Sequence, residues 1–212
     1  MRENFGLFLV LSVLVLSGQT ASFAQAATAT DDEVDARTNV AALSTRLGSK
    51  DPLVRQRAAE ALAKLAAVDQ KKLIEGYRLQ EKDKKVRLAL DWALYRTGKS
   101  NALYQIVLEL DSSRHAQAVS YLSQLDSPAP LHSLLKRDDN QPKITVGIVE
   151  ALGQIGDNES LELIKPYHDS FFPGVSAAAE QATDQIEKRL AQAENPLPTR
   201  PRTVSTTEKP SP

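Results

Sequence analysis

Apolar residues recur along this chain in five copies of one helical pattern. The clearest copy begins at Asp51-Pro52 and has apolar residues at positions 58, 59, 61, 62 and 65. The pair Ala61-Leu62 of this copy aligns with Ala93-Leu94, Tyr121-Leu122, Ala151-Leu152 and Ala182-Thr183, in steps of 32, 28, 30 and 31 residues. A helical pattern repeated at such a period predicts stacked helix pairs.

Each copy contains the signals of two helices joined by a short turn. The first helix opens with Asp51-Pro52, an N-cap residue followed by proline at the first helical position, and Pro142 and Pro173 have the same place in later copies. A further helix over residues 36–47 precedes the first copy. We therefore predict an all-α fold, an α-α superhelix or solenoid of about five helix pairs with an N-terminal capping helix.

The two ends of the chain differ from the repeats in composition. Residues 1–26 contain an apolar run of 12 residues, Phe5 to Leu16, and small residues that permit cleavage after Ala24 or Ala26. Because a membrane span needs about 20 apolar residues, a cleaved signal peptide is favoured over a membrane anchor, which predicts a periplasmic or secreted protein without stable membrane insertion. We expect residues 27–35 to be flexible, residues 36–193 to form the repeats, and the Pro-rich residues 194–212 to be disordered.

The first copies also carry a family resemblance. The run from Leu43 to Leu65 resembles HEAT repeats through Gly48, Asp51-Pro52, Val54-Arg55, Ala58-Ala59 and Ala61-Leu62. More narrowly, it is similar to the short variety, of about 30 residues per repeat, first named from phycobilisome lyases. The resemblance covers residues 36–193. It implies an α-α superhelix and, most often, protein binding, but no single activity, because repeat folds are scaffolds for many sites.

Composition narrows the possible chemistry. The chain has no cysteine, which excludes disulfides, thiolate catalysis and cysteine-ligated metals. Residues 51–99 carry 12 Lys/Arg against 7 Asp/Glu, a balance of +5, whereas residues 100–170 carry 5 against 10, a balance of −5. No uniform basic face is present, so nucleic acid is not an expected partner. The imbalance fits either ordinary solvated helix faces or a dipolar molecule with different contacts at its two ends.

Candidate catalytic residues are sparse. His115, His132 and His168 stand apart from one another, and none belongs to a recognisable metal motif. The pairs Asp51–Arg55 and Asp83–Arg87 are expected to cap helices and link adjacent units rather than to act on a substrate. We predict no catalytic residues, no cofactor and no metal, and therefore a protein that is not an enzyme.

Two sets of residues are candidate partner contacts. One is a row across the second helices of the copies, formed by Ile74, Tyr104, His132 and Glu162. The other is Trp92 with Leu88 and Tyr95, because the residues equivalent to Trp92 in the other copies are polar: Glu60, Ser120, Glu150 and Gln181. The alternatives are that the row is ordinary variable surface, and that Trp92 is packed between neighbouring helices or under the acidic N-terminal segment.

The function expected from these features is that of an exported, non-catalytic scaffold or adaptor that binds another protein. The Pro-rich tail would serve as a tether or a second contact. Two other classes stay open: a lyase or chaperone-like subunit resembling the bilin lyases, and a structural subunit of an envelope complex.

Overall fold

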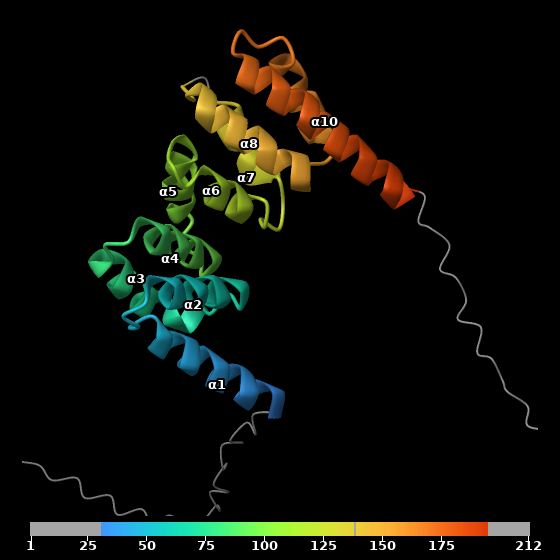
Figure 1. The fold of residues 1–212 in the computed structure, drawn as a ribbon. Coiled ribbons are helices and arrows are strands. Elements are labelled where there is room, and N and C mark those ends of the chain that lie inside the picture. Colours follow the sequence, from blue (N-terminus) through green and yellow to red (C-terminus); the bar gives the residue numbers. More distant parts are fainter. Residues whose placement is uncertain (1–30, 138, 195–212) are drawn as a thin grey trace, which may run out of the picture.

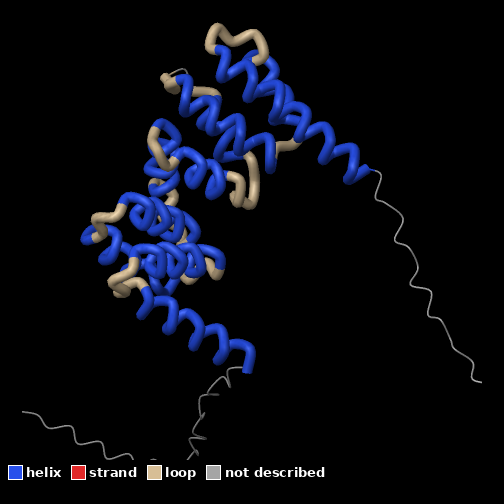
Figure 2. Tube along the Cα trace, in the orientation of Figure 1, coloured by secondary structure: helices blue, strands red, loops and turns tan. Residues whose placement is uncertain are grey.

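The computed structural model describes residues 31–137 and 139–194, and within those residues every regular element is a helix. Ten α-helices and three short 3-10 helices follow one another, and the described part of the chain contains no strand (Figure 2). The prediction of an all-α fold is confirmed. The predicted signal peptide, residues 27–30 and the tail beyond Glu194 lie outside the described residues.

The helices have the following bounds: α1 Asp31–Arg46, α2 Pro52–Lys64, α3 Lys71–Gln80, α4 Lys84–Arg96, α5 Ala102–Leu108, α6 His115–Leu122, α7 Ala129–Leu135, α8 Pro142–Ile155, α9 Asn158–Ile164 and α10 Pro173–Glu194. The 3-10 turns are Val68–Gln70, Glu109–Asp111 and Lys165–Tyr167. In the first four copies the first helix (α2, α4, α6, α8) is followed by a second helix (α3, α5, α7, α9).

The fifth copy differs from the expected helix pair. It is one continuous helix of 22 residues, α10, so the described chain has four pairs and a long single helix rather than five pairs. The physical reason is that no proline or glycine follows Gly174 within this stretch, and nothing in the sequence ends the helix.

The start of the N-terminal helix also differs from the expectation. Helix α1 begins at Asp31, within the segment 27–35 that the sequence predicts to be flexible. Asp31, Asp32 and Glu33 are residue types that the positive end of the helix dipole favours in a first turn. Their acidity, which suggests a solvated linker, is therefore equally compatible with a helix start.

Consecutive first helices lie beside one another along the molecule (Figure 1). Helix α1 packs on α2, α2 on α4, α6 on α8 and α8 on α10. Small residues permit these contacts: a Cβ added at Gly153 of α8 would lie 3.1 Å from the Ala182 Cα of α10. The buried alanines of the repeats, such as Ala59 and Ala93, have the same effect.

Charged residues at the starts of α2 and α4 cap these helices and form local ion pairs. The Asp51 carboxylate accepts the Leu53 N–H at 2.9 Å, and the Asp83 carboxylate accepts the N–H groups of Lys85 and Val86. Arg55 donates two hydrogen bonds to Glu81, at 2.7 and 2.8 Å, and this pairing lowers the pKa of Glu81. The expected capping role is confirmed for Asp51 and Asp83. Arg55 pairs with Glu81, at the end of the second helix of its own copy, rather than with Asp51 or with a residue of another copy.

Arg189 of α10 performs a similar task at the other end of the molecule. Its guanidinium donates hydrogen bonds to the carbonyl oxygens of Gly153 and Gln154, both at 2.8 Å, and to that of Gly156. These are carbonyl groups at the C-terminal end of α8, where the helix itself provides no partner. Arg189 therefore secures α10 to the C-terminal end of α8.

Candidate partner-binding surfaces

The predicted partner contacts separate into buried and exposed residues. Leu88, Trp92, Ile74 and His132 are buried, Tyr95 is half-buried, and Tyr104 and Glu162 are exposed. Neither predicted set forms a continuous exposed surface.

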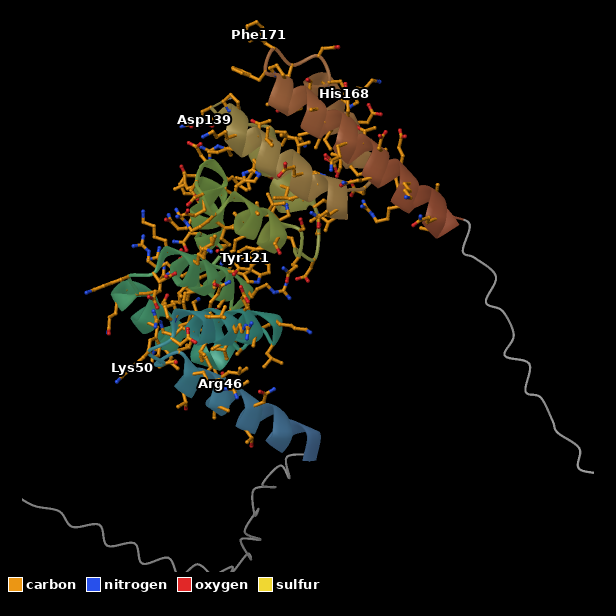
Figure 3. The ribbon with its side chains drawn as sticks, viewed as in Figure 1. Arg46, Lys50, Tyr121, Asp139, His168 and Phe171 are labelled. Carbon is orange, nitrogen blue, oxygen red and sulfur yellow. The ribbon has the colours of Figure 1, made fainter. Side chains whose placement is uncertain are left out.

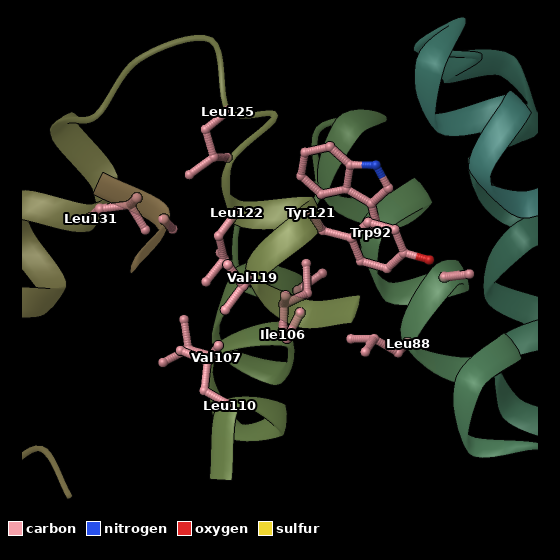
Figure 4. Packing of buried hydrophobic residues seen from close by; sticks show 14 of the residues in the cluster. Leu88, Trp92, Ile106, Val107, Leu110, Val119, Tyr121, Leu122, Leu125 and Leu131 are labelled. Atoms are coloured by element: carbon pink, nitrogen blue, oxygen red, sulfur yellow. The ribbon is translucent and has the colours of Figure 1, made fainter. Parts of the chain in front are cut away.

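Trp92 lies in the interior of an aromatic stack. Its side chain is only 3% exposed. The Tyr121 ring of α6 stacks on it with centroids 5.6 Å apart (Figure 4). The centroid of the Tyr95 ring lies 5.7 Å away. The Arg96 guanidinium is 5.6 Å from the indole centroid. The expectation that Trp92 and Leu88 present an open patch is therefore wrong for this structure, and the alternative of packing between neighbouring helices describes it.

Polar contacts hold the Tyr121 ring over Trp92. The Tyr121 hydroxyl donates to Glu60 of α2 at 2.6 Å and accepts from Gln117 at 2.8 Å. Burial, with the nearby Glu60 carboxylate, raises the pKa of Tyr121. Tyr121 thus reaches from α6 past α4 to α2, and Figure 3 shows it between these layers of helices. The tyrosine that covers Trp92 is therefore itself held in place, because its hydroxyl is hydrogen-bonded to α2 and to its own helix.

A sequence signal for this contact exists. At the position of Tyr121, the other copies have alanine: Ala61, Ala93, Ala151 and Ala182. One copy therefore has a large ring in place of alanine, and the preceding copy has a large ring in place of a polar residue. Trp92 and Tyr121 together indicate a pair of large rings that pack on each other in the core. Trp92 considered without Tyr121 indicates an exposed patch.

The predicted row across the second helices is out of register. The buried branched residues of these helices are Ile74, Ile106, Leu135 and Ile164. Two positions before each of them stands an exposed residue, and these are Lys72, Tyr104, Ser133 and Glu162. Leu73, the first large apolar residue of α3, is exposed, so the residue after it, Ile74, falls on the buried face. In α7 the first large apolar residue, Leu131, and the residue after it, His132, are both buried.

His132 is buried and contacts the capping residues at the start of α9. Its Nε2 lies 2.7 Å from the Ser160 Oγ, and Ser160 closes the capping box of α9 with Asp157. The Glu159 carboxylate lies 3.6 Å from Nδ1, which completes a serine, histidine and acid arrangement. Ser160 is 0% exposed, so a substrate has no access to its hydroxyl in this conformation. The group holds the start of α9 against α7.

A different cluster of exposed side chains lies on α5 and the end of α7. Tyr104 is 47% exposed and Leu108, one turn later, is 44% exposed. The Arg137 guanidinium lies 5.9 Å from the Tyr104 ring centroid and donates two hydrogen bonds to Asp139, at 3.1 and 2.9 Å. We call Tyr104, Leu108 and Arg137 the Tyr104 patch.

The Tyr104 patch has a rigid base. On the opposite face of α5, Ile106 and Val107 are buried in the core between α4, α6 and α8. The patch therefore presents an aromatic ring and an aliphatic side chain on a helix that is packed into the core, with a guanidinium beside them. Preorganisation of this kind lowers the entropic cost of binding.

A histidine joins α6 to α8. The two ring nitrogens of His115 lie 2.7 Å from the Leu110 carbonyl and 2.7 Å from the Glu150 carboxylate. Burial by itself would lower the pKa of His115, but these two acceptors outweigh it and raise the pKa. Since both neighbours accept hydrogen bonds, the geometry suits the doubly protonated ring.

In residues 31–137 and 139–194, no group of three or more histidine or acidic side chains is placed to hold a metal ion. None of the helices in this part of the chain is long and apolar enough to cross a membrane.

Two comparisons with known proteins found no match. No protein-family model matches the chain, and a search of curated proteins gave no match either.

Proposed function

We propose that this protein is an exported, non-catalytic scaffold that binds another protein through the Tyr104 patch. The scaffold would be a HEAT-like solenoid, in which each helix pair packs on its neighbours along the chain. The signal-like composition of residues 1–26 supports export to the periplasm or beyond.

Support for the solenoid comes from which helices touch. The strongest helix contacts join first helices of adjacent copies, such as α2 with α4 and α8 with α10, and each second helix packs on the first helix of its own copy or the next. Contacts that lie mainly between neighbouring units of the chain are typical of repeat arrays. The resemblance to HEAT repeats in residues 43–65 points in the same direction.

The exposure of Tyr104 carries the binding proposal. Tyrosine and arginine are enriched among the residues that contribute most to protein interfaces, because they combine a large apolar surface with hydrogen-bonding groups. Tyr104 and Arg137 are such a pair, and Leu108 extends their apolar surface. A partner that covers the patch would bury an aromatic ring and a leucine that water now contacts.

The test compares matched surface variants. The double substitution Tyr104→Ala/Leu108→Ala removes the apolar part of the patch, and Leu79→Ala removes a leucine that is 86% exposed on α3. Proteins that copurify with the tagged full chain from the envelope fraction are quantified by mass spectrometry, and the binding of a purified candidate is then measured by calorimetry. We expect the double variant to bind at least ~10-fold more weakly, which is about 1.4 kcal/mol, and Leu79→Ala to bind like the parent.

Three outcomes would argue against this function. Equal binding by the double variant and the parent would remove the Tyr104 patch from the interface. Visible absorption bands in the purified protein would favour the pigment-lyase class instead. If the protein is isolated only as part of a large envelope assembly, and the isolated chain binds no partner, a structural subunit would be favoured.

A further inference from the structure

A pair of phenylalanine rings projects from the turn before α10. The Phe171 side chain is 92% exposed and that of Phe172 is 50% exposed. Their ring centroids lie 5.9 Å apart and the ring planes are inclined by 83°, the edge-to-face contact that aromatic pairs favour. Exposed apolar residues that stand singly are ordinary, whereas two adjacent rings form a patch that another molecule can cover. We call Phe171 and Phe172 the phenylalanine tip, and Figure 3 shows Phe171 at one outer end of the molecule.

The turn that carries the phenylalanine tip is attached to α10 on both sides. Before the tip, the Nε2 atom of His168 lies 2.9 Å from the Thr183 hydroxyl of α10. After the tip, the carbonyl oxygen of Phe172 accepts the N–H groups of Val175 and Ser176 in the first turn of α10, at 2.9 and 3.2 Å. The two rings therefore stand on a short turn whose ends are hydrogen-bonded to the last helix of the array.

A groove lies on α3, in the first copy. It is lined by Lys72, Leu73, Gly76, Tyr77 and Gln80 and has a volume of about 340 Å³. Ligand pockets begin at about 300 Å³, so the groove has room for an aromatic side chain. Gly76 keeps it open, because a Cβ atom added there would meet no atom within 4 Å. Glycine is less favourable than alanine inside a helix, and no neighbouring side chain in the described structure requires it at this position.

The tip and the groove lie in regions of opposite charge. Residues 157–172, which end in the tip, contain one Lys against four Asp/Glu, a balance of −3. Residues 71–87, which contain the groove, have seven Lys/Arg against three Asp/Glu, a balance of +4. The exposed Asp169 stands two residues before Phe171, and the exposed Lys72 lines the groove. Complementary fields of this kind guide two surfaces into contact and disfavour contacts between like surfaces.

The two surfaces belong to separate ends of the array. Helix α3 lies in the first copy and the tip precedes the last helix, α10, as the positions of these helices in Figure 1 show. We propose that the phenylalanine tip of one molecule docks into the α3 groove of a second copy of this chain, with Asp169 facing Lys72. Because the two surfaces differ, the contact is heterologous, and association continues until a ring closes or an open filament forms. This contact does not involve the Tyr104 patch and does not depend on the proposed function.

The size of the two surfaces indicates a weak contact. Burial of two phenylalanine side chains removes about 300–500 Å² from water. Even with a similar area from the groove, the total stays below the standard interface of about 1,200–2,000 Å². Association should therefore depend on the protein concentration rather than be complete in dilute solution.

Sedimentation velocity of the purified chain between ~5 and ~500 μM tests the contact. We expect the weight-average sedimentation coefficient of the parent to rise with concentration. Phe171→Ser/Phe172→Ser removes the tip, Gly76→Gln fills the groove, and each variant alone should stay monomeric. An equimolar mixture of the two variants should form dimers and nothing larger, because one variant retains the groove and the other retains the tip.

Two controls separate docking from damage to the fold. Leu53→Ser removes an apolar side chain that is 50% exposed on α2 and does not line the groove, so this variant should associate like the parent. Glutamine is a better helix former than glycine, so Gly76→Gln should not lower the free energy of unfolding measured in urea.

Other results would overturn the proposal. A parent that stays monomeric at every concentration does not form this contact, whether or not its tip then binds vesicles of anionic lipid. Association by Gly76→Gln alone, together with its loss in the phenylalanine variant, would mean that tip meets tip. A mixture of the two variants that stays monomeric would show that tip and groove do not bind each other.

Discussion

Replacement of Trp92 by alanine distinguishes a core residue from a partner contact. The side chain is 3% exposed and is stacked between Tyr95 and Tyr121. Its removal leaves a cavity between α4 and α6 and leaves one face of each tyrosine ring without its neighbour. The Tyr121 hydroxyl stays bonded to Glu60 and Gln117, so the ring is not free to move into the space.

The expected cost is large relative to the stability of a domain. Truncation of a buried aromatic residue to alanine costs about 3–5 kcal/mol, because apolar contacts are lost and the cavity closes only in part. Each favourable aromatic pair adds about 0.5–1.5 kcal/mol beyond the buried area, and two such pairs are lost here. We therefore expect the upper part of this range, against a total unfolding free energy of about 5–15 kcal/mol for a typical domain.

Urea unfolding followed by far-ultraviolet circular dichroism measures the change without relying on tryptophan fluorescence. Tyr104→Ala is the matched control, because it removes an aromatic ring that is 47% exposed, and surface substitutions usually change stability by less than ~0.5 kcal/mol. In the parent protein, the emission of this single tryptophan should be blue-shifted and poorly quenched by acrylamide. Trp92 is not a core residue if Trp92→Ala lowers the free energy of unfolding no more than Tyr104→Ala does, or if acrylamide freely quenches the tryptophan emission of the parent.

Two other predictions concern the core and pH. Leu62→Ala, at a fully buried position of α2, should lower the free energy of unfolding by about 2–5 kcal/mol. Amide hydrogen exchange should accelerate most in α2 and α4 and least in α10. Uniform acceleration would contradict coupling between neighbouring units. His115 has a raised pKa in the folded state, so its stabilising contribution is complete below the ordinary histidine pKa of about 6.5 and is lost as the pH rises through the raised value. The urea midpoint of the parent should fall as the pH rises from about 6.5 through the raised pKa of His115, and it should change less in His115→Gln. Identical pH profiles of the two proteins would show that the contact of His115 with Glu150 does not stabilise the fold.

The helix starts could be predicted from the sequence because their signals are local. Asp51-Pro52 and Asp83 mark helix N-termini through backbone geometry and capping, which depend only on adjacent residues, and the structure places caps there. The same locality explains the confirmed all-α class. Helix type and approximate position follow from periodic apolar residues over ten or more positions.

Contacts between copies could not be read in the same way. The partner of Arg55 is Glu81, 26 residues away, and Tyr121 bonds to Glu60, 61 residues away. Such pairs depend on the offset between stacked helices, which the period alone does not determine. The short second helices illustrate the same limit: α5, α7 and α9 have seven residues each, too few for an apolar stripe to define its register. In α7 a shift of one position is enough to move the expected surface residue from the exposed Ser133 to the buried His132.

Departures from the repeat consensus become informative once their surroundings are known. Trp92 and Tyr104 are both aromatic residues at positions where the other copies have mainly polar residues. Trp92 is compensated, because Tyr121 replaces an alanine in the next copy and covers it. In the described chain Tyr104 has no aromatic partner of this kind, and the guanidinium of Arg137, in the loop after α7, lies over its ring. An aromatic residue that replaces a polar one and is covered by the fold contributes to stability, whereas one that stays half exposed is available to another molecule. This difference is why the binding proposal rests on Tyr104 rather than on the only tryptophan of the chain.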